Sequence, residues 1–491
     1  MELVWKDIDP VRLIADTECT VFIEGLLPPP DGRDIAEVLD STAKVEVEKT
    51  QIDADKVDIT GGITVMVTAL DAGGSVFAFE SYAGYTHTVE LQGARPGMEA
   101  SVAASVKQLR VTAAPDGARL SADAELRVML TTAAPLRVIS SVSGVSDLEL
   151  RSVQYRHNRE TVSGSETLRM REELAEAGVA EVISCGGQVL VRDVNAERDG
   201  VSVSGVLTVS AVTLDGSGHT GELVRQVPFR EKLNIEADDG AFCTAKLVSL
   251  AMHTLGEEFA LMTMEAEIEF TVHSRAQREY EIPTDAFSPS VGFDCLPEEL
   301  RILNAYGCCA IQTQYKELME LPDNAAEIAS ALFASAKPVV TSVECGANEI
   351  IVCGVFTTTL VYESASGTKY AYTDDIPFSI PMPNESGCNM PVVSCECTVQ
   401  PTVGGERTVQ LGYTALLSAF MYGAENVCAV VGLAEKEAPA RADGILIAFA
   451  SQGDTVYDIA KRYLVPCTEV KRLNPDAEEP FSEGERLLLL V

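Results

Sequence analysis

The chain of 491 residues is strongly acidic, with 74 Asp and Glu residues against 37 Lys and Arg residues and a formal net charge of −37. This balance excludes the basic surface with which nucleic-acid-binding proteins neutralise phosphates. No apolar run approaches the ~18 residues of a membrane-spanning helix, so no membrane span is expected. The segment from Met1 to Asp7 has neither the basic nor the apolar region of a signal peptide, so we expect a cytoplasmic protein.

One segment of the chain occurs three times. Val57 to Gly61 corresponds to Val201 to Gly205 and to Ile350 to Gly354, so the glycines lie 144 and then 149 residues apart. The same offsets relate further glycines and aromatic residues, namely Gly74, Gly218 and Gly367, and Tyr85, Phe229 and Phe378. Agreement at so many positions indicates one structural unit repeated three times.

Each copy is predicted to be rich in β-strand. Apolar and polar residues alternate from Ile63 to Thr68, and the other two copies alternate similarly, which is typical of strands with one buried face. The glycines at 74, 218 and 367 lie in short polar segments and are predicted to form hairpin turns, where glycine supplies a positive φ. Short helices are expected before the strands, at Asp34 to Leu39, Glu172 to Glu176 and Ala325 to Phe333.

The repeats divide the chain into four expected domains, at residues 1–145, 150–286, 295–433 and 444–491. Pro283 to Cys309 is predicted to be a linker into the third copy. Ala434 to Asp443, which contains Glu, Lys, Pro and Ala, is predicted to be a hinge before the last domain. The expected fold class is therefore multidomain and mainly β, with three repeated β-rich domains and one small C-terminal βααβ domain.

The C-terminal domain has its own pattern. The apolar run from Ile445 to Ala450 predicts a strand, and Leu487 to Val491 predicts another. Between them, Thr455 and Asp458 are placed as the capping box of a first helix. Its apolar face consists of Val456, Ile459, Ala460 and Tyr463. A second helix is predicted from Thr468 to Leu473, where Asn474-Pro475 ends it.

No motif in the chain predicts catalysis. Gly216 to Gly221 spells G-x-G-x-x-G, but the following residues contain Val227-Pro228 and align with strands of the other copies, which favours a hairpin loop over a dinucleotide site. Walker A, HExxH and G-x-S-x-G motifs are absent. The thirteen cysteines contain no C-x-x-C pair, and the five histidines lie far from the close cysteine pairs, so we predict no metal, cofactor or catalytic residue.

The repeated unit resembles the SPOCS domain of endospore-forming bacteria. The resemblance lies in a Leu-Pro stretch and an expected short Ile/Leu helix, then a strand that ends in glycine, then a Pro-Phe strand. In the third copy the first two features are Glu320 to Asp323 and Glu327 to Ala329. The first copy departs from the pattern, because Ala83 to Tyr85 stands where the others have Pro-Phe.

The C-terminal domain resembles a LysM domain, through Gly453-Asp454-Thr455, the Ile459 to Tyr463 segment, Leu473-Asn474-Pro475 and Gly484. LysM domains bind peptidoglycan and other N-acetylglucosamine-containing glycans, in a shallow groove between the loop after the first strand and the loop after the second helix. The resemblance places the binding residues at Gly453, Asp454, Thr455, Val456, Asn474, Pro475, Asp476 and Ala477. Glu478, Glu479 and Glu483 make this edge acidic.

SPOCS repeats followed by one LysM domain are the layout of a family of spore-coat morphogenetic proteins. This resemblance implies a non-enzymatic scaffold that is made in the mother cell and lies on the forespore surface. Its LysM-like domain would dock on a coat-basement protein or on a glycan. An alternative is a cell-wall protein that its LysM domain holds on peptidoglycan. A glycan hydrolase is a third hypothesis, although the three upstream units share no pair of acidic residues.

Overall fold

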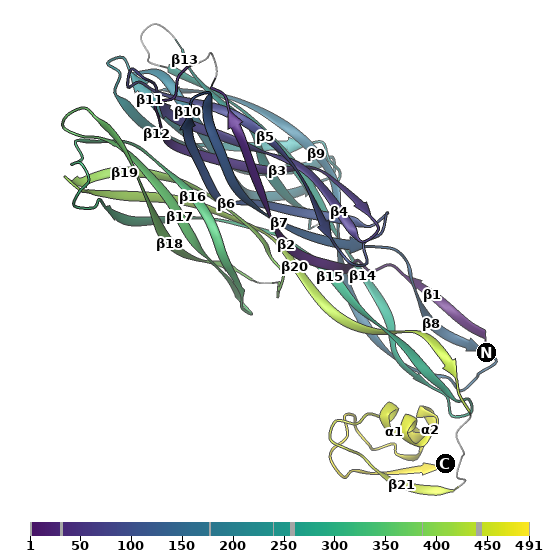
Figure 1. Ribbon diagram of the computed structural model, residues 1–491. Coiled ribbons are helices and arrows are strands. Elements are labelled where there is room, and N and C mark those ends of the chain that lie inside the picture. The colour runs from purple at the N-terminus through teal and green to yellow at the C-terminus, as the bar shows by residue number, and fades with distance from the viewer. Residues whose placement is uncertain are drawn as a thin grey trace.

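The computed structural model describes residues 2–29, 33–175, 178–238, 240–255, 261–384, 386–437 and 444–490. Almost all of the regular structure is antiparallel β-strand, which confirms the expected mainly β class. Figure 1 shows an elongated molecule with a broad head, a narrower stem of long strands, and a small C-terminal module beyond the tip of the stem. The N-terminus lies near that tip.

The elements follow the three sequence repeats. The first repeat contains β1 (Glu2–Ile8), β2 (Arg12–Leu27), β3 (Glu37–Asp53), β4 (Lys56–Leu70), β5 (Val76–Glu90), β6 (Glu99–Ala114), β7 (Gly117–Thr132) and β8 (Leu136–Ser143). The second contains β9 (Glu149–Ala175), β10 (Val179–Glu197), β11 (Gly200–Asp215), β12 (Thr220–Leu233), β13 (Phe242–Leu255) and β14 (Leu261–Phe287). The third contains β15 (Phe293–Glu320), β16 (Ser330–Cys345), β17 (Glu349–Glu363), β18 (Lys369–Pro383), β19 (Val392–Gly405) and β20 (Thr408–Glu435). The C-terminal module contains β21 (Ile445–Phe449), α1 (Val456–Tyr463), α2 (Cys467–Leu473) and β22 (Arg486–Leu490).

In the head, each repeat forms a β-sandwich of two three-stranded layers, and one layer of the first repeat and one of the third belong to a single six-stranded sheet. The pairs are β3-β4-β5 on β2-β7-β6, β10-β11-β12 on β13-β14-β9, and β16-β17-β18 on β19-β20-β15. Each sandwich has its own apolar core, because every sheet buries the apolar side of its alternating strands. Sheets of the first and third repeats meet where β2 pairs with β15, through Arg12 and Ile302.

The repeated glycine and the repeated aromatic residue form one contact in each sandwich. Gly61, Gly205 and Gly354 lie opposite Tyr85, Phe229 and Phe378 on the neighbouring strand. A Cβ on Gly354 would lie 2.3 Å from the Val339 carbonyl oxygen and 2.6 Å from the Phe378 ring. The ring therefore covers the glycine, and no larger residue fits beneath it.

The predicted hairpins are confirmed and the predicted helices are wrong. Gly74, Gly218 and Gly367 have φ of +80°, +83° and +80° in the turns that lead into β5, β12 and β18. The Asp34 to Leu39 and Ala325 to Phe333 segments instead run into the starts of β3 and β16, and residues 172–175 end β9. Glu176 lies outside the described residues. Local helix preference is weak, and pairing with a neighbouring strand overrides it.

The linker predicted at Pro283 to Cys309 is also mostly strand. β14 continues to Phe287 and β15 begins at Phe293, so only residues 288–292 connect them. The expected hinge begins inside β20, which ends at Glu435, and its residues 438–443 lie outside the described part of the chain. The domain boundaries themselves stay a prediction.

The three sandwiches close on one another in a ring. β5 of the first contacts β10 of the second, β12 of the second contacts β16 of the third, and β18 of the third contacts β3 of the first. These strands occupy equivalent places in the three repeats, so the head has approximate threefold symmetry. Leu39, Ile183 and Leu332 stand at one repeated position and pack in a single apolar cluster.

The stem consists of the continuations of the same strands. β9, β14, β15 and β20 are 27 or 28 residues long, which spans roughly 90 Å at ~3.3 Å per residue. Together with the β1–β8 pair they form three ribbons, one from each repeat. The ribbons share apolar clusters that include Ile8, Tyr280 and Ile302. The head and the stem therefore form one continuous body.

Replacing a covered glycine should destabilise its sandwich. Gly354→Ala is expected to lower the free energy of unfolding by about 2–3 kcal/mol, because the new methyl group overlaps backbone and ring atoms. The measurement is urea unfolding followed by circular dichroism. Gly216→Ala is the matched control, since nothing lies within 4 Å of its Cβ, and equal losses in the two variants would contradict the assignment.

Closure of the ring should depend on an ion pair between the third and first repeats. Lys337 Nζ lies 3.5 Å from Asp40 Oδ1, and the Asp40 side chain is only 6% exposed. Lys337→Met is expected to cost about 3 kcal/mol of unfolding free energy, because it leaves a buried carboxylate without its counter-charge. Adding Asp40→Asn should restore most of this loss.

Lys436→Met is the control for that variant. It breaks the Lys436–Asp294 pair, in which both side chains are more than 60% exposed, and should cost less than about 1 kcal/mol. A loss for Lys337→Met that is no larger than the control would show that the pair does not hold the ring closed.

Candidate functional site

The C-terminal module has the predicted order of strand, helix, helix and strand. Its two strands pair antiparallel, and the two helices pack on them around a core that includes Ile459, Phe481 and Leu487. The predicted capping box is present at the start of α1. Thr455 Oγ1 accepts a hydrogen bond from the Asp458 N–H at 3.4 Å, and the Asp458 carboxylate accepts one from the Thr455 N–H at 2.9 Å.

A small groove lies between the start of α1 and the loop after α2. Its volume is about 280 Å³, and it is lined by Val456, Val470, Lys471, Asn474, Pro475, Ala477, Glu479 and Phe481. Four of the eight predicted binding residues, Val456, Asn474, Pro475 and Ala477, are therefore brought together here. Five of the eight lining residues are apolar, and Lys471, Asn474 and Glu479 supply the polar part of the surface.

The other predicted residues do not line the groove. Gly453 adopts φ of +87° and donates its N–H to the Phe481 carbonyl. The Asp454 carboxylate accepts hydrogen bonds from the Ser451 N–H and from Arg462, both at 2.8 Å. These residues hold the loop in shape. Asp476 is exposed beside the groove.

Asn474 lines the groove but also fastens it. Its Nδ2 donates to the Val470 and Leu488 carbonyl oxygens at 2.8 Å, and its Oδ1 accepts from the Leu488 N–H at 2.7 Å. The side chain therefore ties the loop after α2 to the last strand. The donor and the acceptor of its side-chain amide are therefore both hydrogen-bonded within the protein.

Glu479 and Lys471 were not predicted as site residues. Glu479 Oε2 accepts a hydrogen bond from the Val456 N–H at 3.1 Å, and its other oxygen lies 3.6 Å from Lys471 Nζ. Glu479 is one of the acidic residues expected at the edge of the groove, but the contact of Glu479 with the start of α1 depends on the fold. This contact uses a backbone donor that would otherwise face the groove.

The module is attached to the tip of the stem through one side of α1 and through the start of α2, where the Cys467 N–H donates to Glu149 of β9 at 3.1 Å. Arg151 of β9 donates to Thr455 Oγ1 at 2.8 Å, pairs with Asp458 at 2.7 Å, and lies over the Tyr457 ring. Asp285 of β14 pairs with Lys461 at 2.6 Å. The residues that line the groove are not among these contacts, so the stem holds the module and leaves the groove open.

Arg151 changes the titration of Asp458. Burial alone would raise the pKa of this carboxyl, but the hydrogen bonds from Arg151 and Thr455 outweigh burial and lower the pKa to about 2. Because the hydrogen bonds stabilise the carboxylate, its contribution to stability is complete above the ordinary value of 3.8. That contribution is lost as the pH falls toward 2.

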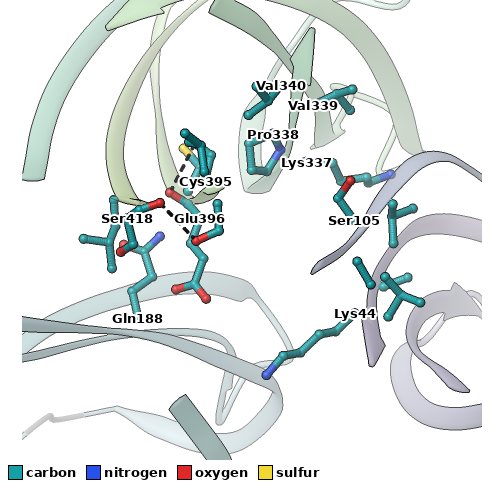
Figure 2. A pocket seen from close by; sticks show the side chains of 18 of the residues that line it. Lys44, Ser105, Gln188, Lys337, Pro338, Val339, Val340, Cys395, Glu396 and Ser418 are labelled. Carbon is teal, nitrogen blue, oxygen red and sulfur yellow. Dashed lines mark hydrogen bonds between the residues drawn. The ribbon is translucent and has the colours of Figure 1, made fainter. Parts of the chain in front are cut away.

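A much larger cavity lies in the head, where the three sandwiches meet. Its volume is about 2270 Å³, and its walls come from all three repeats. Figure 2 shows Lys44, Gln188 and Lys337 projecting into it, together with Glu396. Lys44, Gln188 and Lys337 occupy one repeated position, separated by 144 and 149 residues. No motif marked this cavity in the sequence, because it forms only when the ring closes.

The described residues bring together no group of three or more His, Cys, Asp or Glu side chains that could hold a metal ion. Within the same residues, neither helix is long and apolar enough to cross a membrane.

A protein-family model described as "SipL, SPOCS domain" matches residues 34–114. The match covers β3 to β6 in the first sandwich, and the presence of this domain indicates a sporulation-related protein. Nothing among the curated proteins and nothing among the solved structures matches the chain. The resemblance of the C-terminal module to a LysM domain stays a prediction.

Asp458→Asn should loosen the module in a pH-dependent way. At pH 6 the variant is expected to lose roughly 1 kcal/mol of stability, since it weakens both the helix cap and the pair with Arg151. The difference from the unmodified protein should shrink as the pH falls from about 5 toward 2. Calorimetric unfolding of both proteins across this pH range measures the difference in stability. Asp476→Asn, at an exposed position, is the control, and a difference that does not depend on pH would contradict the role of the carboxylate.

Proposed function

We propose that this protein is a non-enzymatic structural scaffold of the bacterial spore envelope, made in the mother cell and located on the forespore surface. The observation that carries the proposal is the SPOCS match over residues 34–114, within the first of three sandwiches built in the same way. A continuous head and stem, with the C-terminal module fixed at the tip, suit a protein that holds two layers apart at a defined distance.

In this proposal the groove of the C-terminal module docks on a coat-basement protein. Glu479 supports a protein partner over a glycan, because it occupies the Val456 N–H, a donor that could otherwise bind the acetamido group of a sugar. The remaining surface of the groove combines apolar walls with Lys471 and Glu479, which is typical of a protein contact of modest size.

Binding of peptidoglycan or another N-acetylglucosamine-containing glycan is the alternative. It is favoured by the position of the groove, between the loops before α1 and after α2, and by the apolar side chains Val456, Pro475 and Ala477, which could contact the face of a sugar ring.

A fluorescent fusion of the full chain in a sporulating bacterium tests the scaffold. The protein should gather at the forespore surface. Ala477→Gln fills the groove and should leave the fusion diffuse in the mother cell, because at least tenfold weaker docking is expected. Glu478→Gln, at an exposed neighbouring position, should behave like the unmodified protein. Uniform fluorescence of all three proteins throughout sporulation would contradict the proposal.

Sedimentation of the purified full chain with peptidoglycan sacculi separates the two partners. The scaffold proposal predicts that the protein remains in the supernatant. Strong retention on sacculi that Ala477→Gln abolishes and Glu478→Gln preserves would establish the glycan alternative instead.

A further inference from the structure

The head cavity is too large for an ordinary small molecule. Its volume of about 2270 Å³ exceeds the range of roughly 300–1,000 Å³ that is usual for small-ligand sites. Polar and apolar groups line it in similar measure, and Figure 2 shows the side chains from different strands converging on one space. An occupant of this size would be a polymer segment, such as part of a polypeptide.

The walls of the cavity are edge strands. β3, β10 and β16 lie at the edges of their sheets, as do β6, β13 and β19, and all six contribute to the lining. An edge strand presents backbone N–H and C=O groups on its unpaired side, which is the surface that an extended peptide uses when it adds to a sheet. The ring turns these edges inward, toward one space.

At some of these backbone groups, a side chain already makes the hydrogen bond that a neighbouring strand would make. Lys107 Nζ donates to the Val340 carbonyl of β16 at 2.7 Å, and Lys44 Nζ donates to the Leu247 carbonyl of β13 at 3.5 Å. The Gln188 amide oxygen can accept from the N–H groups of Cys397 and Thr398 in β19, both at 3.0 Å, once the amide is oriented to suit them. These contacts satisfy a few backbone groups, and the edges between them have no strand partner in the described chain.

The charge of the cavity favours a cationic occupant. Eight acidic and five basic side chains line it. Four of the bases are already paired: Lys107 with Glu125, Arg127 with Asp16, Lys337 with Asp40, and Lys44 with Glu46 outside the lining.

Five carboxylates in the lining have no such partner among the described residues, and Glu222 and Glu396 are two of them. Glu222 Oε2 is buried and has no hydrogen-bond partner among the described residues. The Glu396 residue is exposed to the cavity, and no hydrogen bond or ion pair joins its side chain to another described residue. The surrounding protein raises its pKa by desolvation, which Lys44 only partly offsets. Desolvation raises the pKa of Glu222 to about 8 and also raises that of Glu396, so each carboxyl group favours its protonated form while it has no counter-charge. A cationic side chain that enters the cavity would stabilise the carboxylate and take the place of that proton.

We propose that the head cavity binds an extended, basic peptide segment of a partner protein, which adds to the inward-facing edge strands and pairs its cationic side chains with Glu222 and Glu396. The site is separate from the groove of the C-terminal module, so a negative result for the head cavity would not contradict the scaffold proposal. A chain with this site would hold two partners, one in the head and one at the tip of the stem.

Fluorescence anisotropy with the full chain tests this site. The probe is a fluorescein-labelled decapeptide of alternating lysine and valine, used in 0.5 M NaCl so that attraction to the acidic outer surface is screened. Saturable binding is expected, and the paired Glu222→Gln and Glu396→Gln substitutions should weaken it at least tenfold. The paired Glu24→Gln and Glu90→Gln substitutions remove the same charge from exposed positions outside the cavity and should change it less than twofold.

Two further probes test the mode of binding. A peptide of the same sequence in which every backbone amide is N-methylated cannot donate strand hydrogen bonds and should bind at least tenfold more weakly. A glutamate–valine peptide should not bind. Hydrogen exchange of the complex should slow at the edge strands of the head, β6 and β19 among them. Absence of saturable binding, equal weakening by the two pairs of substitutions, or protection confined to the stem or the C-terminal module would each overturn the proposal.

Discussion

The structure depends on where the three sandwiches place their edge strands and on what covers them. A sandwich of two three-stranded sheets has open edges on both sides, and exposed edges invite uncontrolled pairing. In this protein the β3–β6, β10–β13 and β16–β19 sides turn toward the centre of the ring, where lysine and glutamine side chains cover part of the backbone. Prolines 228, 338, 377 and 401 lie on edge strands, where a missing N–H removes no ladder hydrogen bond.

Closure also determines the stem. Because the strands of each sandwich continue past the head, three sandwiches in a ring bring three ribbons together, and the ribbons bury apolar side chains that a single ribbon could not cover. The C-terminal module then packs against the end of one ribbon, with Phe287 joining its core. The distance between the cavity and the groove is therefore set by the length of continuous strands.

Much of the local structure could be predicted from the sequence, because it depends on residues close together in the chain. The hairpins at Gly74, Gly218 and Gly367 and the capping box at Thr455 and Asp458 follow from local patterns. The contact between each repeated glycine and its aromatic residue was not predicted, because it depends on the register of two strands. The short helices were wrong, because Ala325 to Phe333 resembles a helix until β17 pairs with its end. The Pro283 to Cys309 linker was wrong, because the prolines at 283 and 297 sit at register shifts inside long strands.

The sites could be predicted only in part, for the same physical reason. The groove combines residues less than thirty positions apart, and four of the eight residues predicted to bind lie in it. The attachment of the module depends on Arg151 and Asp285, which are far away in sequence, and the head cavity depends on the contact between the first and third repeats. No local pattern encodes such contacts.

Small-angle X-ray scattering of the full chain tests the closure of the ring most directly. A closed ring predicts a scattering curve that fits a compact head on a long stem, with the first and third sandwiches in contact. A curve that requires three sandwiches in a row, with the first and third apart, would contradict the closed ring and remove the central cavity with it.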